Sequence, residues 1–334
     1  MDVLVLGSKE VVALLPMREC IDRMHDTLVA LARGDVVQPL RTIMWLPARR
    51  GAIGLMPGAL ARPDVAGVKI VSVFPSNIET HYESHQGAVL LFDTRHGCLQ
   101  AVVDAGAITA IRTAAASGLA TRVLARADAG DLALLGSGTQ ARTHLEAMRC
   151  VRGLRRVRVW SRDHGKAQTF AKVHTRSCGI EIEAVASPRD AVEGADLICT
   201  TTAAHEPILE GAWIAPGAHV NAVGACFPRA RELDTEAVQR ARVFVDCRES
   251  ALNEAGDLLI PLREGAFDAS HILGEIGEVL TERVPGRERE NDVTLFKSLG
   301  IAIEDVAAVH HVYRKACESK LGKRLEIGGL REAP

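Results

Sequence analysis

A glycine-rich turn follows a short apolar segment near the middle of the chain. Residues 132–135 are Leu-Ala-Leu-Leu, and they lead into Gly-Ser-Gly-Thr-Gln-Ala at positions 136–141. In this pattern the first glycine permits a tight turn, the second lets the backbone approach a ligand, and the alanine lets a helix pack on the strand. A strand, such a turn and a helix N-terminus predict a site for the pyrophosphate of a dinucleotide; a tight turn without a ligand is the alternative. The cofactor-binding residues predicted here are Gly136, Gly138, Thr139, Gln140 and Ala141.

The next predicted strand, residues 156–160, ends at Ser161, Arg162 and Asp163. A site that prefers NAD has a carboxylate at this strand end for the ribose hydroxyls, whereas an NADP site has a small residue and an arginine for the 2′-phosphate. Ser161 and Arg162 fit the second pattern, so the sequence favours NADPH, with NADH as the alternative. Two other interpretations stay open: Arg162 as a solvated loop residue, and Asp163 as the ribose ligand.

Three cations in the N-terminal region have apolar or small neighbours. Lys69 lies between Val68 and Ile70, Arg112 lies in an alanine-rich segment, and Arg41 is the third. Cations are rarely buried without a partner, and a ligand carboxylate would supply one, gripped by arginine through a bidentate fork. For each cation taken alone, a protein carboxylate or a path to water is the favoured explanation.

The elements that must position these residues follow from hydrophobic patterning. Apolar residues at 4-3-4-3 spacing from Met17 to Leu31 predict a helix that ends near Gly34. Strand-like segments at 67–73 and 88–93, separated by turn residues, suggest a largely antiparallel or mixed sheet. An alanine-rich helix at about 104–125 leads out of this region.

From about residue 128 onward, strands and helices alternate. This alternation predicts an α/β fold with a doubly wound parallel sheet, in the manner of a Rossmann domain. The predicted strands are 131–135, 156–160, 181–185, 196–202, 218–223 and 242–246. Residues 287–292 are expected to form a solvated loop, and residues 301–320 one long helix.

Composition excludes some classes of partner. The chain has 334 residues, 47% of them hydrophobic, and a formal net charge of −2. It has no long basic block, so we expect neither nucleic acid nor membrane as a partner. The eight cysteines form no Cys-x-x-Cys pair or ligand cluster and suggest reduced thiols in a cytoplasmic protein. Residues 1–7 lack the basic segment of a signal peptide, and no stretch approaches the length of a membrane span.

A series of short motifs runs along almost the whole chain in a characteristic order. They are Arg41-Thr42, Gly54-Leu55-Met56-Pro57, Val68-Lys69, Ser84-His85-Gln86, Leu91-Phe92-Asp93, residues 109–115, residues 136–141, Ala195-Asp196, residues 206–209, residues 216–225, Glu232-Leu233-Asp234 and residues 296–300. Together they resemble the ornithine cyclodeaminase/mu-crystallin family.

The resemblance implies a domain arrangement. Residues 126–300 would form the Rossmann domain, and residues 1–125 with 301–334 a second, α+β domain that holds the substrate and forms a homodimer. We expect the alanine-rich helix and the last helix to help form the dimer interface. The resemblance also puts Val223, Lys297 and Ser298 near the cofactor.

The resemblance also assigns roles to the three cations. Arg41, Lys69 and Arg112 would hold the substrate carboxylate beside the nicotinamide, as the catalytic and substrate-binding set. We accordingly expect the partner of Arg112 to be that carboxylate and not a carboxylate of the protein. His85 is a further candidate for substrate binding.

Two positions depart from ornithine cyclodeaminases. Those enzymes carry a glutamate at the position of Gly54 and an aspartate at the position of Cys226. Cyclodeamination needs acid–base groups, which a glycine cannot supply and a thiol supplies poorly. The chain is therefore more similar to the mu-crystallin branch, whose members reduce cyclic imines. Cys226 would then shape the substrate pocket, or merely be a small residue beside the nicotinamide.

These parts predict NADPH-dependent reduction of the C=N bond of an imino acid, either cyclic, such as a pyrroline or piperideine carboxylate, or linear. A protonated imine is the better hydride acceptor, so the site need only favour that cation and hold it in line. Lys69 is instead the proton donor if burial among cations lowers its pKa, with His81 and His85 as rival acids. The two histidines lack a third ligand, so no metal is expected. The alternatives are a reversible amino acid dehydrogenase, an ornithine cyclodeaminase-type enzyme, and a cofactor-loaded, crystallin-like binding protein with little turnover.

Overall fold

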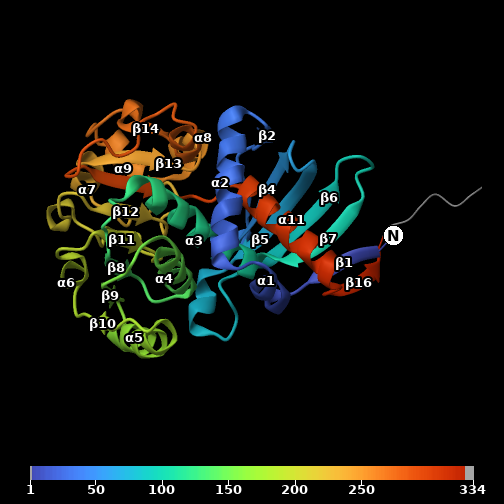
Figure 1. Cartoon of the computed structure of the whole chain (residues 1–334), viewed down its shortest axis with the longest axis horizontal. Coiled ribbons are helices and arrows are strands. Elements are labelled where there is room, and N and C mark those ends of the chain that lie inside the picture. The colour runs from blue at the N-terminus through green and yellow to red at the C-terminus, as the bar shows by residue number, and fades with distance from the viewer. Residues whose placement is uncertain (1, 328–334) are drawn as a thin grey trace, which may run out of the picture. The chain divides into compact units, whose positions relative to one another are not determined.

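The computed structural model describes residues 2–327 and contains two compact units. One unit consists of Met1–Arg112 and the segment from Ile301 onward, and the other of Thr113–Gly300 (Figure 1). The prediction placed the first boundary at residue 125. In the structure this boundary lies after Arg112, because helix α3 (Ala105–Leu124) is continuous and its first part belongs to the first unit.

The first unit is built on one mixed sheet. Its strand order is β16-β1-β7-β6-β5-β4-β2, with β3 paired to β4, and only β1 and β7 run parallel to each other. The strands are β1 (Asp2–Leu6), β2 (Val36–Val37), β3 (Thr42–Trp45), β4 (Ala52–Leu60), β5 (Val65–Val73), β6 (His85–Asp93), β7 (Leu99–Asp104) and β16 (Lys323–Glu326). The largely antiparallel sheet predicted here is confirmed.

Helix α11 (Ala302–Ser319) lies across β4, β5 and β6, and α2 (Met17–Arg33) packs against it (Figure 1). Two glycines permit the close approach of α11. A Cβ on Gly58 would lie 3.1 Å from Ala302, and one on Gly67 would lie 3.0 Å from Val306. The unit also contains α1 (Ser8–Leu14) and the short 3-10 helices η1 (Pro47–Arg49) and η2 (Pro75–Glu79).

The two faces of this sheet differ in exposure. Side chains alternate along a strand, so Lys69 faces α11 with Val65 and Gly67, whereas Ile70 faces the other way. On that opposite face Met44 (54% exposed), Leu55 (40%) and Ile70 (36%) come from three neighbouring strands. We call these three residues the exposed apolar face.

The second unit is a parallel sheet with strand order β10-β9-β8-β11-β12-β15-β13-β14. The strands are β8 (Asp131–Leu135), β9 (Arg156–Trp160), β10 (Ile182–Ala184), β11 (Leu197–Thr200), β12 (His219–Ala222), β13 (Ala241–Val245), β14 (Ile272–Glu275) and β15 (Val293–Lys297). The predicted Rossmann-type sheet is confirmed. The sequence prediction missed β14 and β15, which are short, although β15 is fully buried and lies between β12 and β13.

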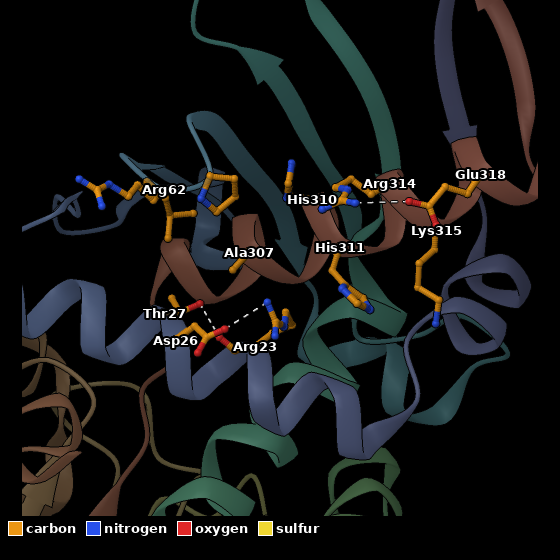
Figure 2. A pocket seen from close by; sticks show the side chains of 12 residues that line it. Arg23, Asp26, Thr27, Arg62, Ala307, His310, His311, Arg314, Lys315 and Glu318 are labelled. Atoms are coloured by element: carbon orange, nitrogen blue, oxygen red, sulfur yellow. Dashed lines mark hydrogen bonds and ion pairs between the residues drawn. The ribbon is translucent and has the colours of Figure 1, made fainter. Parts of the chain in front are cut away.

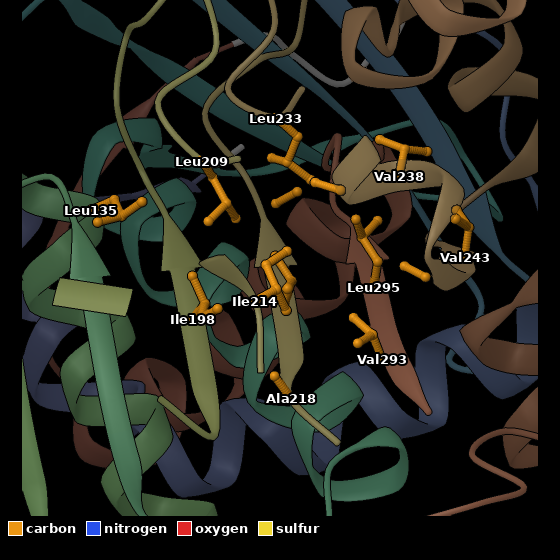
Figure 3. Packing of buried hydrophobic residues seen from close by; sticks show 14 of the residues in the cluster. Leu135, Ile198, Leu209, Ile214, Ala218, Leu233, Val238, Val243, Val293 and Leu295 are labelled. Carbon is orange, nitrogen blue, oxygen red and sulfur yellow. The ribbon is translucent and has the colours of Figure 1, made fainter. Parts of the chain in front are cut away.

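Aliphatic side chains from these strands and from the loops beside them form the core of the second unit (Figure 3). Its helices are α4 (Thr139–Val151), α5 (His164–Cys178), α6 (Pro188–Val192), α7 (Thr235–Gln239), α8 (Arg248–Glu254), α9 (Gly256–Arg263) and α10 (Ile276–Leu280), with η3 (Gly211–Trp213) and η4 (Ala269–His271). Among the described residues, no helix combines the length and apolar character needed to cross a membrane.

The helices expected at a dimer interface are already buried within the single chain. Leu119 of α3 and Val309 of α11 have no exposed surface, and neither do most of their apolar neighbours on the same helices. Their place in a dimer interface stays a prediction; within the single chain both helices bury most of their apolar surface. The exposed apolar face of the sheet is the surface that a partner could cover.

Candidate active site

Two cations and two carboxylates are buried together in the first unit. Lys69 comes from β5 and Arg112 from α3, whereas Glu304 and Asp305 lie in the first turn of α11. Lys69 Nζ lies 2.7 Å from Asp305 Oδ2, Arg112 Nε lies 2.8 Å from Asp305 Oδ1, and Arg112 Nη1 lies 2.9 Å from Glu304 Oε2. The cations are 3% exposed and the acids not at all. We call these four residues the ion cluster; its formal charges balance.

The expectation that Arg112 has no partner carboxylate in the protein was therefore wrong. A buried guanidinium must be neutralised, and here α11 supplies two carboxylates to do so. Glu304 and Asp305 escaped the sequence analysis because acids in the first turn of a helix are ordinary partners of the helix dipole. Their burial follows from the packing of α11 on the sheet, which the local sequence does not reveal.

Burial and neighbouring charges set the protonation of Lys69. Desolvation lowers its pKa to about 8, with Asp305 opposing the shift and Arg112 and Arg41 adding to it. Burial also disfavours ionisation of Asp305, but Arg112 and Lys69 outweigh it and hold the pKa of that carboxyl below its usual value. The result is an ammonium group that can give up a proton near neutral pH, beside a carboxylate that stays charged.

Other predicted site residues lie near Lys69. The effect of Arg41 on the pKa of Lys69 indicates that this half-buried cation is close by. His85 opens β6 on the same strand face as Val89, the residue paired with Lys69. Desolvation and then Lys69 lower the pKa of His85.

The rival histidine, His81, lies in an exposed loop and contacts Tyr82, with ring centres 4.1 Å apart. No group of three or more His, Cys, Asp or Glu side chains within the described part of the chain could hold a metal ion.

Gly54 lies on the face of the sheet that carries the ion cluster. It pairs with Val71 and is two residues from Met56, which pairs with Lys69. Because residues two apart share a strand face, a glutamate at this position would place its carboxylate on the face of Lys69. Gly54 instead leaves this part of the face without a side chain.

In the second unit, the glycine turn has the geometry expected of a phosphate cradle. Gly136 has a φ of 121°, and a Cβ there would lie 2.6 Å from Thr201 Oγ1, so only glycine fits. Gly138 caps α4, and a Cβ on it would meet nothing within 4 Å. The N-terminus of α4, whose first backbone N–H groups have no partner within the helix, thus adjoins open space, which suits an anion. Ala141 is fully buried, as predicted. These residues fit a dinucleotide pyrophosphate.

The end of β9 distinguishes the two candidate ribose ligands. Asp163 caps α5, because its side chain accepts a hydrogen bond of 3.2 Å from the backbone N–H of Lys166. Its carboxylate thus has a local structural role. Arg162 is exposed and Ser161 is half-buried.

A second buried network orders the loops at the carboxyl edge of this sheet. Glu232 accepts hydrogen bonds from Thr200 Oγ1 (2.7 Å), Thr202 N (2.6 Å) and Gly224 N (2.7 Å). Burial, followed by the charge of Asp257, raises the pKa of Glu232. Glu232 belongs to one of the family motifs, but its sequence position did not predict this role.

The predicted cofactor residues at this edge have different environments. Lys297 is fully buried with its Nζ 2.9 Å from Asp257 Oδ2, so its side chain has a structural role that the sequence did not predict. Ser298 Oγ is buried and has no hydrogen-bond partner among the described residues. Val223 is buried, and Cys226 is half-buried beyond it, donating to the carbonyl of Val223 at 3.4 Å.

Comparison with known proteins adds independent evidence. The model of the ornithine cyclodeaminase/mu-crystallin family matches residues 1–320. The ketimine reductase mu-crystallin of Mus musculus is 41% identical over 280 residues, which cover 84% of this chain and 85% of that protein.

Two solved structures share the whole architecture. Delta(1)-pyrroline-2-carboxylate reductase of Thermococcus litoralis, in complex with NADH and L-proline, has a TM-score of 0.95 and 38% identity, covering 97% of this chain and 100% of that one. An archaeal alanine dehydrogenase dimer with bound NAD has a TM-score of 0.93 and 30% identity, covering 98% and 100%. The fold, the glycine turn and these matches agree that the chain belongs to the ornithine cyclodeaminase/mu-crystallin family.

Proposed function

We propose that this protein reduces the C=N bond of an imino acid, cyclic or linear, with NADPH. The observation that carries the proposal is the ion cluster, in which a lysine with a pKa of about 8 shares one buried carboxylate with an arginine. The mouse relative is a ketimine reductase, and the Thermococcus structure contains NADH and L-proline, both of which support an imino acid substrate.

Three cations would bind the substrate carboxylate. Within the ion cluster the charges of Lys69 and Arg112 are balanced by Glu304 and Asp305, and Arg41 brings a third cation to them. The guanidinium groups suit a bidentate grip on a carboxylate. Asp305 holds both Lys69 and Arg112, so it fixes their side chains before substrate arrives.

Lys69 would donate the proton. NADPH, when bound, supplies a hydride to the imine carbon; the imine nitrogen then takes the proton from Lys69 Nζ, which leaves the amine and a neutral lysine that regains its proton from water. A donor with a pKa of about 8 is largely protonated at neutral pH and still gives its proton up readily. Gly54 and Cys226 put no carboxylate at the positions that ornithine cyclodeaminases use, so a reductase is favoured over cyclodeamination.

The dinucleotide would bind at the glycine turn and α4, with Arg162 on the 2′-phosphate. The local cap made by Asp163 supports NADPH over NADH, because it engages the only other charged candidate at this strand end. NADH stays the alternative, since the Thermococcus relative binds it.

The exposed apolar face supports a homodimer, since Met44, Leu55 and Ile70 present apolar side chains that a second copy would cover. The archaeal alanine dehydrogenase is a dimer. None of the eight cysteines, all within the described residues, forms a disulfide, which supports a reducing, cytoplasmic location.

A panel of cyclic and linear imino acids, followed by NADPH absorbance, tests the reductase. We expect steady oxidation of NADPH with at least one imino acid, and no ammonia when the amine product is oxidised in reverse. Ammonia release from a primary amino acid would instead assign a reversible dehydrogenase, which the alanine dehydrogenase relative makes the second candidate. No turnover with any imino acid would leave a cofactor-loaded binding protein.

The structure also predicts the behaviour of Arg112 variants. Arg112→Met should abolish turnover and lower the free energy of unfolding by about 3–5 kcal/mol, because it leaves Glu304 and Asp305 buried without their guanidinium. Arg112→Lys keeps the charge but loses the fork, so it should fold and turn over slowly. The control Arg122→Met, at an exposed site on the same helix, should change stability little. Urea unfolding with wild-type stability for Arg112→Met would contradict the ion cluster.

Lys69 predicts a pH profile. If its ammonium donates the proton, kcat/KM is at its maximum below its pKa of about 8 and falls about tenfold per pH unit above it. In Lys69→Arg this decrease of kcat/KM with rising pH should be absent up to about pH 10, because guanidinium stays protonated. A fall near pH 8 in both proteins would assign the titration to the substrate imine and refute Lys69 as the donor.

Arg162→Ala should remove most of the preference for NADPH. Losing one charge-assisted contact to the 2′-phosphate weakens NADPH binding by about tenfold, whereas the Kd for NADH should not change. Fluorescence titration of both nucleotides measures this difference, and the variant Arg176→Ala, at an exposed arginine in the last turn of α5, is the control. Equal binding of NADH and NADPH by the unaltered protein would show that Arg162 does not bind the phosphate.

A further inference from the structure

A cavity of 410 Å³ lies in the first unit, lined by α2, by the turn after β4 and by α11 (Figure 2). Its polar lining includes Arg23, Arg62, His310, His311, Arg314 and Lys315. None of the four residues of the ion cluster lines it. We call it the α2–α11 cavity.

Positive charge dominates this cavity. Four permanent cations line it. Asp26 and Glu318 in the lining oppose them and Glu19 pairs with Lys315, so a formal excess of one positive charge remains. We propose that the α2–α11 cavity binds a small metabolite through a phosphoryl group, at a site separate from the imine-reducing centre. A phosphate monoester carries a charge of about −1.5 to −2 at neutral pH, so this excess of positive charge attracts it.

The cations are not committed to strong internal pairs. Arg23 and Asp26 lie 3.1 Å apart and Arg314 and Glu318 3.4 Å apart, but all four side chains are well exposed (44% to 67%). Exposed pairs of this kind contribute little free energy, so an incoming anion can replace them at low cost. Arg62 makes no ion pair with any residue in the described part of the chain.

Lys315 and His311 extend the donor set from the next turn of α11. Both contact Glu19, at 3.0 Å and 2.8 Å, and so share one carboxylate. Burial lowers the pKa of His310, and the charges of Arg314 and His311 lower it further. His310 is therefore a neutral imidazole that can donate one hydrogen bond without adding charge.

The geometry favours a phosphoryl group over a single carboxylate. Arginines line the cavity from α2 (Arg23), from the turn after β4 (Arg62) and from α11 (Arg314). A phosphoryl group presents three oxygens from one centre and can accept from several such forks. Leu60, Pro63 and Ala307 add an apolar wall for the organic part of the ligand. The volume lies in the range of sites for small molecules.

Calorimetric titration with phenyl phosphate and with pyrophosphate tests the site. The protein is saturated with NADPH, so that the glycine turn is occupied. We expect one saturable site per chain, and binding weakened at least about tenfold in the double variant Arg62→Ser/Arg314→Ser. The control Arg95→Ser removes an exposed arginine in the turn after β6 and should bind as the unaltered protein does. The single variant Arg62→Ser keeps the test usable if the double variant folds poorly.

Steady-state kinetics separate this site from the active site. The double variant should retain the KM values of the unaltered protein for the imino acid and for NADPH. The calorimetric test of the cavity does not depend on turnover. Absence of saturable binding, or equal binding by the unaltered protein and the double variant, would overturn the site. Succinate binding as tightly as the phosphoryl probes would overturn the ligand class.

Discussion

Two cations cannot be buried between a helix and a sheet unless carboxylates are buried with them, and this constraint organises the first unit. Glu304 and Asp305 must reach Arg112 and Lys69, so the first turn of α11 must lie close to β5. Glycines at positions 58 and 67 make that approach sterically possible. The close packing of α11 on the sheet and the neutralisation of the buried cations therefore depend on each other.

The second unit also contains buried carboxylates, but they are stabilised differently. There the buried acids serve mainly the backbone: Glu232 gathers N–H and hydroxyl groups from two loops, and Asp257 accepts from the N–H groups of Glu232 and Leu233 while it neutralises Lys297. An acid with several hydrogen bonds and a nearby ammonium is tolerated in a core, whereas an unsatisfied one is not. These networks give the carboxyl edge of the sheet a defined shape without any ligand.

Local sequence patterns predicted several elements of the fold and of the candidate cofactor site. The glycine turn and the helix ending at Gly34 depend on neighbours in sequence, and the structure has both as expected. The partners of Arg112 depend on residues more than 190 positions away, which no local pattern encodes. Strand β15 was missed because a charged loop precedes a short buried segment, and periodicity alone does not classify such a segment. The family resemblance placed Lys297 near the cofactor, and its pairing with Asp257, 40 residues away in the chain, is likewise not encoded in a local pattern.

Helix α11 contributes side chains both to the ion cluster and to the α2–α11 cavity. Its first turn carries Glu304 and Asp305, and its later turns carry His310, Arg314 and Lys315. Helix α2, on the other side of the cavity, carries Cys20; burial raises the pKa of its thiol, and the charges of Glu304 and Asp305 raise it further. The same helix therefore supplies both the carboxylates that neutralise the ion cluster and cations that line the α2–α11 cavity.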